Sequence, residues 1–146
     1  MTKPYTLIDK AFLLKQLSIF ETVDLDILLA ISDKLTTLVY EKPEVVFFEE
    51  EMANRMYFIM EGAVHITIGA EFICRLEKRT FFGEESLFSN KPRAYKAEAV
   101  ENTVLFSLNR SILFPAISEN PSIALGFLQE YTACMKFRPY TLESRR

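Results

Sequence analysis

Residues 81–95 read FFGEESLFSNKPRAY, and the rest of the chain is best interpreted outward from them. Gly83 is one of only four glycines in 146 residues, and glycine allows a close backbone approach or a positive φ. Residues 85–88 suit a single helical turn, whose first N–H groups attract anions. Pro92 ends such a turn, and Arg93 then supplies a permanent, fork-shaped cation that fits a phosphate. The stretch therefore predicts an anion-binding site.

The same residues resemble the phosphate-binding cassette of the cyclic-nucleotide-binding domain family, as found in catabolite activators and in regulatory subunits of protein kinase A. The matching residues are Gly83-Glu84, Ser86-Leu87 and Pro92-Arg93-Ala94. Residues 44–47 and 56–64 are also similar to the family's first strands and the tight turn between them. The resemblance extends over nearly the whole chain, from about residue 11 to about residue 135.

The resemblance implies a role for each cassette residue. Glu84 would accept a hydrogen bond from the ribose 2′-hydroxyl, and Arg93 would pair with the exocyclic oxygens of a cyclic phosphate. Backbone N–H groups around Ser86-Leu87 and at Ala94 would complete the anion site, and Gly83 would allow the close approach. The implied ligand is a cyclic purine monophosphate, cAMP or cGMP.

The cassette departs from the family pattern at two positions. Glu85 stands where the family usually has an aliphatic residue, and its carboxylate would repel a bound phosphate. Tyr95 stands where a small residue or threonine is usual. By alternation along a strand expected over 93–100, Tyr95 points to the same side as Arg93, where its ring either stacks on a purine or fills the pocket. Family turn glycines are also replaced, by Pro43 and Glu50.

The last predicted helix, which begins at Pro121-Ser122, carries a possible contact for the base. In the family this helix closes over the ligand, so Phe127 or Tyr131 would stack on the base. The alternative is that the apolar stripe of this helix packs on the β-roll or on a second copy of the chain. If it does not pack on the β-roll, the helix would mediate a homodimer or the contact with the rest of a larger parent protein.

Hydrophobic periodicity predicts helices, then about seven or eight short strands, then helices again. Short β-prone runs between turn residues indicate a jelly roll, and the resemblance implies an eight-stranded β-roll with N-terminal helices and two C-terminal helices. The fold class is therefore mainly β with flanking α. We expect one domain with a helical lead-in (1–35), a β-roll (36–109) containing the cassette (82–95), C-terminal helices (110–138) and a tail (139–146).

The composition argues against several other classes of protein. A net charge of −3 and a pI near 5.3 disfavour nucleic acid as a bulk electrostatic partner. No run of 18 apolar residues and no signal-peptide pattern are present, which predicts no membrane span and a cytoplasmic location. Cys74 and Cys134 form no motif, and His65 is the only histidine, so neither a metal site nor a cofactor site is expected. The sequence also lacks a nucleophile elbow and a Walker motif, so no enzyme activity is expected.

Two functions of different kinds remain open. The first is a regulatory sensor that binds a cyclic nucleotide and repositions its final helix. The second is a degenerate domain that keeps the fold, binds no nucleotide and serves as an interaction or dimerisation module. About ten residues follow Phe137, too few for a helix-turn-helix, so we expect no DNA binding.

Overall fold

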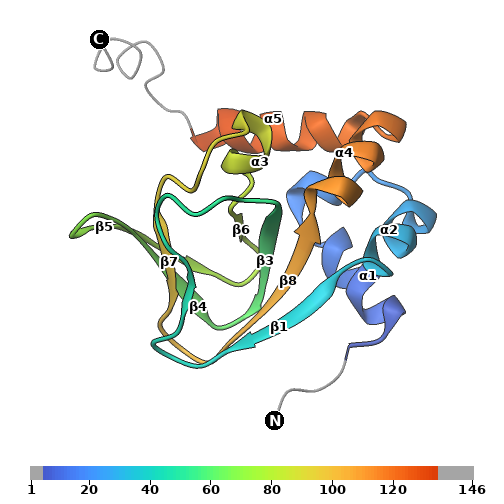
Figure 1. Cartoon of the computed structure of the whole chain (residues 1–146). Helices are drawn as coiled ribbons and strands as arrows, with labels where there is room; N and C mark the ends of the chain where they lie inside the picture. The colour runs from blue at the N-terminus through green and yellow to red at the C-terminus, as the bar shows by residue number, and fades with distance from the viewer. Residues whose placement is uncertain (1–4, 135–146) are drawn as a thin grey trace.

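The structure, a computed structural model, describes residues 5–134. It contains eight strands in two antiparallel four-stranded sheets, with helices before and after them. Figure 1 shows the helices gathered along one side of the β-roll, with α5 beside α3. This confirms the predicted fold class, which is mainly β with flanking helices.

The N-terminal helices begin at a capping box. The hydroxyl of Thr6 accepts the N–H of Asp9 at 3.1 Å, and the N–H of Thr6 donates to the Asp9 carboxylate at 3.1 Å. This reciprocal pair satisfies two N–H groups that the first turn leaves without helical partners. The elements that follow are α1 (Leu7–Lys15), the 3₁₀ turn η1 (Ser18–Phe20) and α2 (Leu25–Ser32).

The two sheets are assembled from strands that are distant in sequence. The first sheet has the order β1 (Thr36–Tyr40), β8 (Thr103–Asn109), β3 (Arg55–Glu61) and β6 (Phe81–Phe82). The second has the order β2 (Val45–Phe47), β7 (Lys96–Ala99), β4 (Ala63–Ile68) and β5 (Glu71–Glu77). The short strand β6 was not predicted, and it leads directly into the cassette.

The side chains of β3 alternate between two hydrophobic cores, as the period of a strand requires. Met56, Phe58 and Met60 face the helices, whereas Tyr57 and Ile59 face the second sheet. The first sheet is therefore covered on both faces, which explains why β3 reads as a nearly continuous apolar run.

The C-terminal helices are α4 (Arg110–Glu119) and α5 (Ser122–Cys134). A Cβ on Gly126 would lie 2.6 Å from the carbonyl oxygen of Ile19, so glycine is required for α5 to approach η1 this closely. The hydroxyl of Ser18 donates to Glu130 at 2.7 Å across the same contact. Residues 135–138 of the predicted helical region, and the predicted tail, lie outside the described residues.

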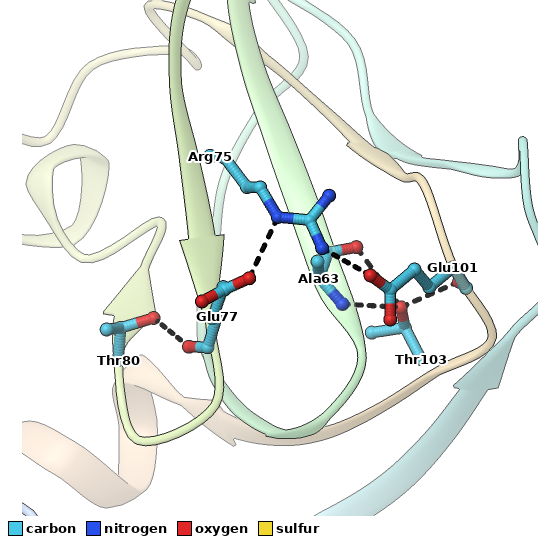
Figure 2. Close-up of polar contacts among 6 residues, drawn as sticks. All are labelled: Ala63, Arg75, Glu77, Thr80, Glu101 and Thr103. Atoms are coloured by element: carbon cyan, nitrogen blue, oxygen red, sulfur yellow. Dashed lines mark hydrogen bonds and ion pairs between the residues drawn. The ribbon is translucent and has the colours of Figure 1, made fainter.

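Polar contacts link β5 with the turn before β8, and link β8 with the start of β4 (Figure 2). Arg75 on β5 bonds Glu77 at 2.9 Å and also bonds Glu101 in the turn before β8. The buried hydroxyl of Thr103 lies 3.3 Å from the N–H of Ala63 and 2.8 Å from the carbonyl oxygen of Glu101. These contacts fix the connections between the two sheets.

Within residues 5–134, no helix combines the length and apolar character that crossing a membrane requires.

Candidate functional site

The cassette runs from the end of β6 to the start of β7. Gly83 has φ +85°, a conformation that favours glycine, and α3 (Glu85–Ser89) follows as a single short helix. Asn90 ends this helix in the left-handed conformation, with φ +57°. The strand predicted over 93–100 is shorter in the structure, because β7 (Lys96–Ala99) begins only at Lys96. Arg93 and Tyr95 therefore lie in the loop before the strand.

Arg93 is held by backbone carbonyls and an aromatic ring. It is only 3% exposed, and its Nη1 and Nη2 groups donate to the carbonyl oxygens of Gly83 (2.5 Å) and Arg55 (2.7 Å). The guanidinium carbon lies 4.1 Å from the centroid of the Phe47 ring, which is a cation–π contact. Burial lowers the pKa of the Arg93 guanidinium from its ordinary value. The cation is thus buried in the β-roll with partly satisfied donors.

The main chain at Arg93 is fixed as firmly as its side chain. Its N–H donates to the carbonyl oxygen of Glu51 at 2.8 Å, and its carbonyl oxygen accepts the N–H of Glu50 at 2.8 Å. A Cβ on Gly83 would lie 2.9 Å from Arg93 Nη1, so the missing side chain of this glycine leaves room for the guanidinium. The close approach predicted for Gly83 is therefore made, in this structure, to Arg93.

Glu84 lies at the other end of the cassette and is 4% exposed. Its Oε2 accepts the hydroxyl of Tyr131 on α5 at 2.6 Å. Among residues 5–134, nothing hydrogen-bonds its buried Oε1. Burial and then the neighbouring Glu85 carboxylate raise the pKa of Glu84 to about 7. The carboxylate therefore has unused acceptor capacity.

The two residues that depart from the family pattern meet at Gly83. The hydroxyl of Tyr95 accepts the N–H of Gly83 at 2.8 Å and donates to Oε1 of Glu85 at 2.8 Å. The Tyr95 ring packs against Phe47, with 5.5 Å between ring centroids. Burial is the largest of the effects that raise the pKa of the Tyr95 hydroxyl. Tyr95 and Arg93 thus share the Phe47 ring, although neither is in a strand.

The remaining predicted cassette residues differ in exposure. Leu87 is fully buried in the helical core, and its N–H donates to the carbonyl oxygen of Glu84 at 3.0 Å. The hydroxyl of Ser86 lies 3.4 Å from the carbonyl oxygen of Pro92, and Ala94 is exposed. The Leu87 N–H is therefore used within the turn, whereas Ala94 lies at the surface.

Of the two candidates for contact with the base, the structure brings only Tyr131 to the cassette by a hydrogen bond. Phe127 is 3% exposed and packs between Phe81 and Phe88, at centroid distances of 5.3 and 5.2 Å. Phe127 therefore anchors α5 on the cassette in this conformation. An apolar groove of about 620 Å³ lies between α3 and α5, and its lining includes Phe88, Leu128 and Tyr131.

Sequence reasoning missed Phe47 and Arg55 as parts of the site. Phe47 lies on β2 and Arg55 starts β3, so both are far from the cassette in sequence. Arg55 contributes a backbone carbonyl, which carries no side-chain signal. Phe47 lies in a flank that resembles the family, but the strand pattern does not show which ring a cation will contact.

The chain is similar to known proteins in both sequence and fold. A family model described as the cyclic nucleotide-binding domain matches residues 37–120, which is more than half of the chain. The chain therefore belongs to the cyclic nucleotide-binding domain family.

Individual relatives share parts of this chain. A protein of Rhodopseudomonas palustris named as a potassium channel protein is 40% identical over 87 residues, which are 58% of this chain and 21% of that protein. A CRP-like cAMP-activated global transcriptional regulator of Mycobacterium tuberculosis is 26% identical over 122 residues, 80% of this chain and 54% of that protein. The chain thus spans between about a fifth and about half of the length of these curated relatives.

The fold also has close matches among solved structures. The regulatory domain of Toxoplasma gondii PKA, crystallised with cAMP, superposes with a TM-score of 0.75 at 18% identity. The match covers 85% of this chain and 48% of that one. At this identity the likeness shows the shared fold.

Proposed function

We propose that this domain is a regulatory module that binds a cyclic purine nucleotide, cAMP or cGMP, through Glu84 and Arg93. The observation that carries the proposal is the pair of buried, oppositely charged side chains at the two ends of the cassette, 4% and 3% exposed. Burying a charge is costly unless hydrogen bonds and a counter-charge compensate it. A ligand with a phosphate and a free hydroxyl supplies both, and two of the similar proteins above carry cAMP in their names.

Each side chain retains the donors or acceptors that such a ligand needs. A guanidinium has five N–H donors, and the carbonyls of Gly83 and Arg55 account for two of those on Arg93. The Tyr57 side chain also interacts with the guanidinium, and the donors that remain are suited to the phosphate oxygens through charge-assisted bonds. Oε1 of Glu84, which has no partner within the described part of the chain, is suited to accept the ribose 2′-hydroxyl. The cassette would thereby test for both parts of the nucleotide.

The regulatory output would pass through α5. Tyr131 donates to the same carboxylate that would hold the ribose, so occupancy of Glu84 and the docking of α5 share one group. Two sites that share a group are coupled, and the coupling acts equally in both directions. A second copy of the chain, or another domain of a larger protein, would receive the signal from α5.

A second candidate is an interaction module that no longer binds nucleotide. The observation that favours it is the packing of Tyr95 beside Arg93, with both side chains against the Phe47 ring. In that case Arg93 would be a structural residue whose partners are the two carbonyls and the ring. Apolar side chains of α5 that are more than half exposed, Leu125 (53%) and Leu128 (60%), would then serve as contact surface.

Isothermal titration calorimetry with cAMP and cGMP distinguishes the two candidates. The control ligand is 5′-AMP, which shows whether any nucleotide phosphate binds or only a cyclic one. We expect heat with a cyclic nucleotide and a loss of at least about tenfold in affinity for Arg93→Lys, because an ammonium cannot reproduce the guanidinium fork. The matched control is Arg75→Lys, which changes an arginine on β5 that pairs with Glu77 and Glu101 and should leave binding unchanged. If neither the natural protein nor Tyr95→Ala gives heat at millimolar nucleotide while remaining folded, the interaction module is the correct reading.

A further inference from the structure

We propose that Glu85 and Tyr95 form one latch on the Gly83 amide, and that this latch sets how tightly the cassette holds a nucleotide. The inference rests on the proposed function and extends it to two residues at which this chain departs from its family. It treats the two departures as one device, because they are bonded to each other.

The geometry of the latch is a chain of two hydrogen bonds. The Gly83 N–H donates to the Tyr95 oxygen at 2.8 Å, and the Tyr95 hydroxyl donates to Glu85 Oε1 at 2.8 Å. The carbonyl oxygen of Gly83 accepts Arg93 Nη1 at 2.5 Å. Both polar groups of the Gly83 residue are therefore occupied by side chains from the loop before β7. A nucleotide that needs this amide, or the space beside Arg93, must first displace Tyr95.

The charges of the latch act on the same groups that would hold the ligand. Glu85 is a cause of the raised pKa of Glu84, and it also acts electrostatically on Arg93. The Glu85 carboxylate is thus a negative charge of the protein itself that acts on Arg93, as a bound phosphate would. The Tyr95 hydroxyl joins that charge to the backbone, since it accepts from Gly83 while it donates to Glu85.

The latch also explains how a carboxylate is tolerated in the cassette. An isolated carboxylate beside a phosphate site only weakens binding through repulsion. A carboxylate that is bonded to Tyr95 in the closed state instead stabilises that state, and a hydrogen bond to a charged group contributes more than one between neutral groups. The two mechanisms predict different results when the residues are changed together.

The test is a double-mutant cycle on cAMP and cGMP affinity with Tyr95→Phe, Glu85→Ala and the double variant, because alanine leaves the Tyr95 hydroxyl no acceptor at position 85. Tyr5→Phe and Glu61→Ala form a matched control, since Tyr5 donates its hydroxyl to Glu61 outside the cassette. Each latch variant should bind about tenfold more tightly, as expected when a bond to a charged group no longer holds the closed state. The double variant should gain about the same tenfold rather than a hundredfold, because each single change already opens the latch. The control pair should leave the affinity unchanged.

Three results would count against the latch, and the first two are distinguishable from failure of the proposed function. Unchanged affinity in both single variants would overturn it and leave the nucleotide site intact. Additive gains would also overturn it, since they indicate that Glu85 acts by repulsion and Tyr95 by bulk. Absence of binding in the natural protein and in every folded latch variant would overturn the proposed function, and the latch with it. Binding by the latch variants alone would support both.

Discussion

Arg93 and Glu84 lie equally deep in the cassette, but different parts of the molecule hold them. Two backbone carbonyls, the Phe47 ring and the main chain of residues 50–51 hold Arg93, and all of these belong to the β-roll. One hydroxyl from α5 holds Glu84, its other oxygen lacks a partner among the described residues, and the carboxylate of Glu85 lies nearby. The cation is therefore part of the scaffold, whereas the carboxylate depends on a helix.

This difference has a physical consequence for the domain. Backbone carbonyls in strands and tight turns move little, so the position of Arg93 is set when the roll folds. Glu84 carries an uncompensated cost of burial, which its raised pKa expresses. The cassette is therefore preorganised at Arg93 and adjustable at Glu84. Three changes test this contrast.

The largest expected effect is that of Arg93→Ala on stability. The change leaves the carbonyl oxygens of Gly83 and Arg55 unpaired in a buried place and removes the contact with Phe47. We expect the free energy of unfolding to fall by about 3–5 kcal/mol, measured by urea denaturation. Arg75→Ala is the control, because this arginine pairs at the surface, and it should have little effect. Equal effects of the two changes would show that Arg93 is not part of the scaffold.

The next effect is on the pH dependence of stability, through Glu84→Gln. The pKa of Glu84 is raised from 4.5 to about 7 in the folded state, so between these values the folded state binds more protons than the unfolded state. Stability from this group is therefore present below about pH 4.5 and is lost as the pH rises towards 7, by up to about 3 kcal/mol. Glutamine keeps an acceptor for Tyr131 and does not titrate, so this part of the slope should disappear in urea titrations at a series of pH values.

An unchanged slope in Glu84→Gln would mean that the carboxylate is stabilised as fully as the guanidinium. The contrast between the two ends of the cassette would then fail. If instead the natural protein lost more stability at low pH than Glu84→Gln does, the same conclusion would follow, because a well-partnered carboxylate has a lowered pKa.

The smallest effect is that of Gly83→Ala compared with Gly69→Ala. Both glycines have positive φ, +85° and +60°, so alanine should cost about 1–2 kcal/mol at each from the backbone alone. A Cβ at Gly83 would also press on Arg93 Nη1 at 2.9 Å, whereas nothing lies within 4 Å at Gly69. We therefore expect a lower thermal midpoint for Gly83→Ala than for Gly69→Ala. Equal midpoints would indicate that the Arg93 side chain shifts easily, contrary to its proposed rigidity.

The sequence was sufficient for the architecture and for the identity of the charged pair. The order of helices and strands depends on local hydrophobic periodicity, and the structure agrees with it. The family resemblance then located Glu84 and Arg93, which the structure places in one buried cassette. Their roles in binding a ligand remain predictions.

The contacts that distinguish the two ends could not be read from the sequence. Tyr131 reaches Glu84 across 47 residues, and the carbonyl of Arg55 reaches Arg93 across 38, so both depend on the packing of elements that share no local pattern. Strand alternation predicts that Tyr95 lies on the same side as Arg93, but β7 starts only after Tyr95. The two side chains do lie together, and their shared contact with the Phe47 ring is the reason.

The close approach of Gly126 to Ile19 also determines how α5 is able to move. Sliding by one turn would bring Ile123 or Glu130, which carry side chains, against the Ile19 backbone, so translation along the axis is blocked. α5 can instead tilt about this contact, with Gly126 as the pivot point. Tyr131 lies roughly 7.5 Å and Cys134 roughly 12 Å beyond it at 1.5 Å per residue. A small displacement at the Glu84 carboxylate would therefore be enlarged by about one and a half times at the end of the described helix.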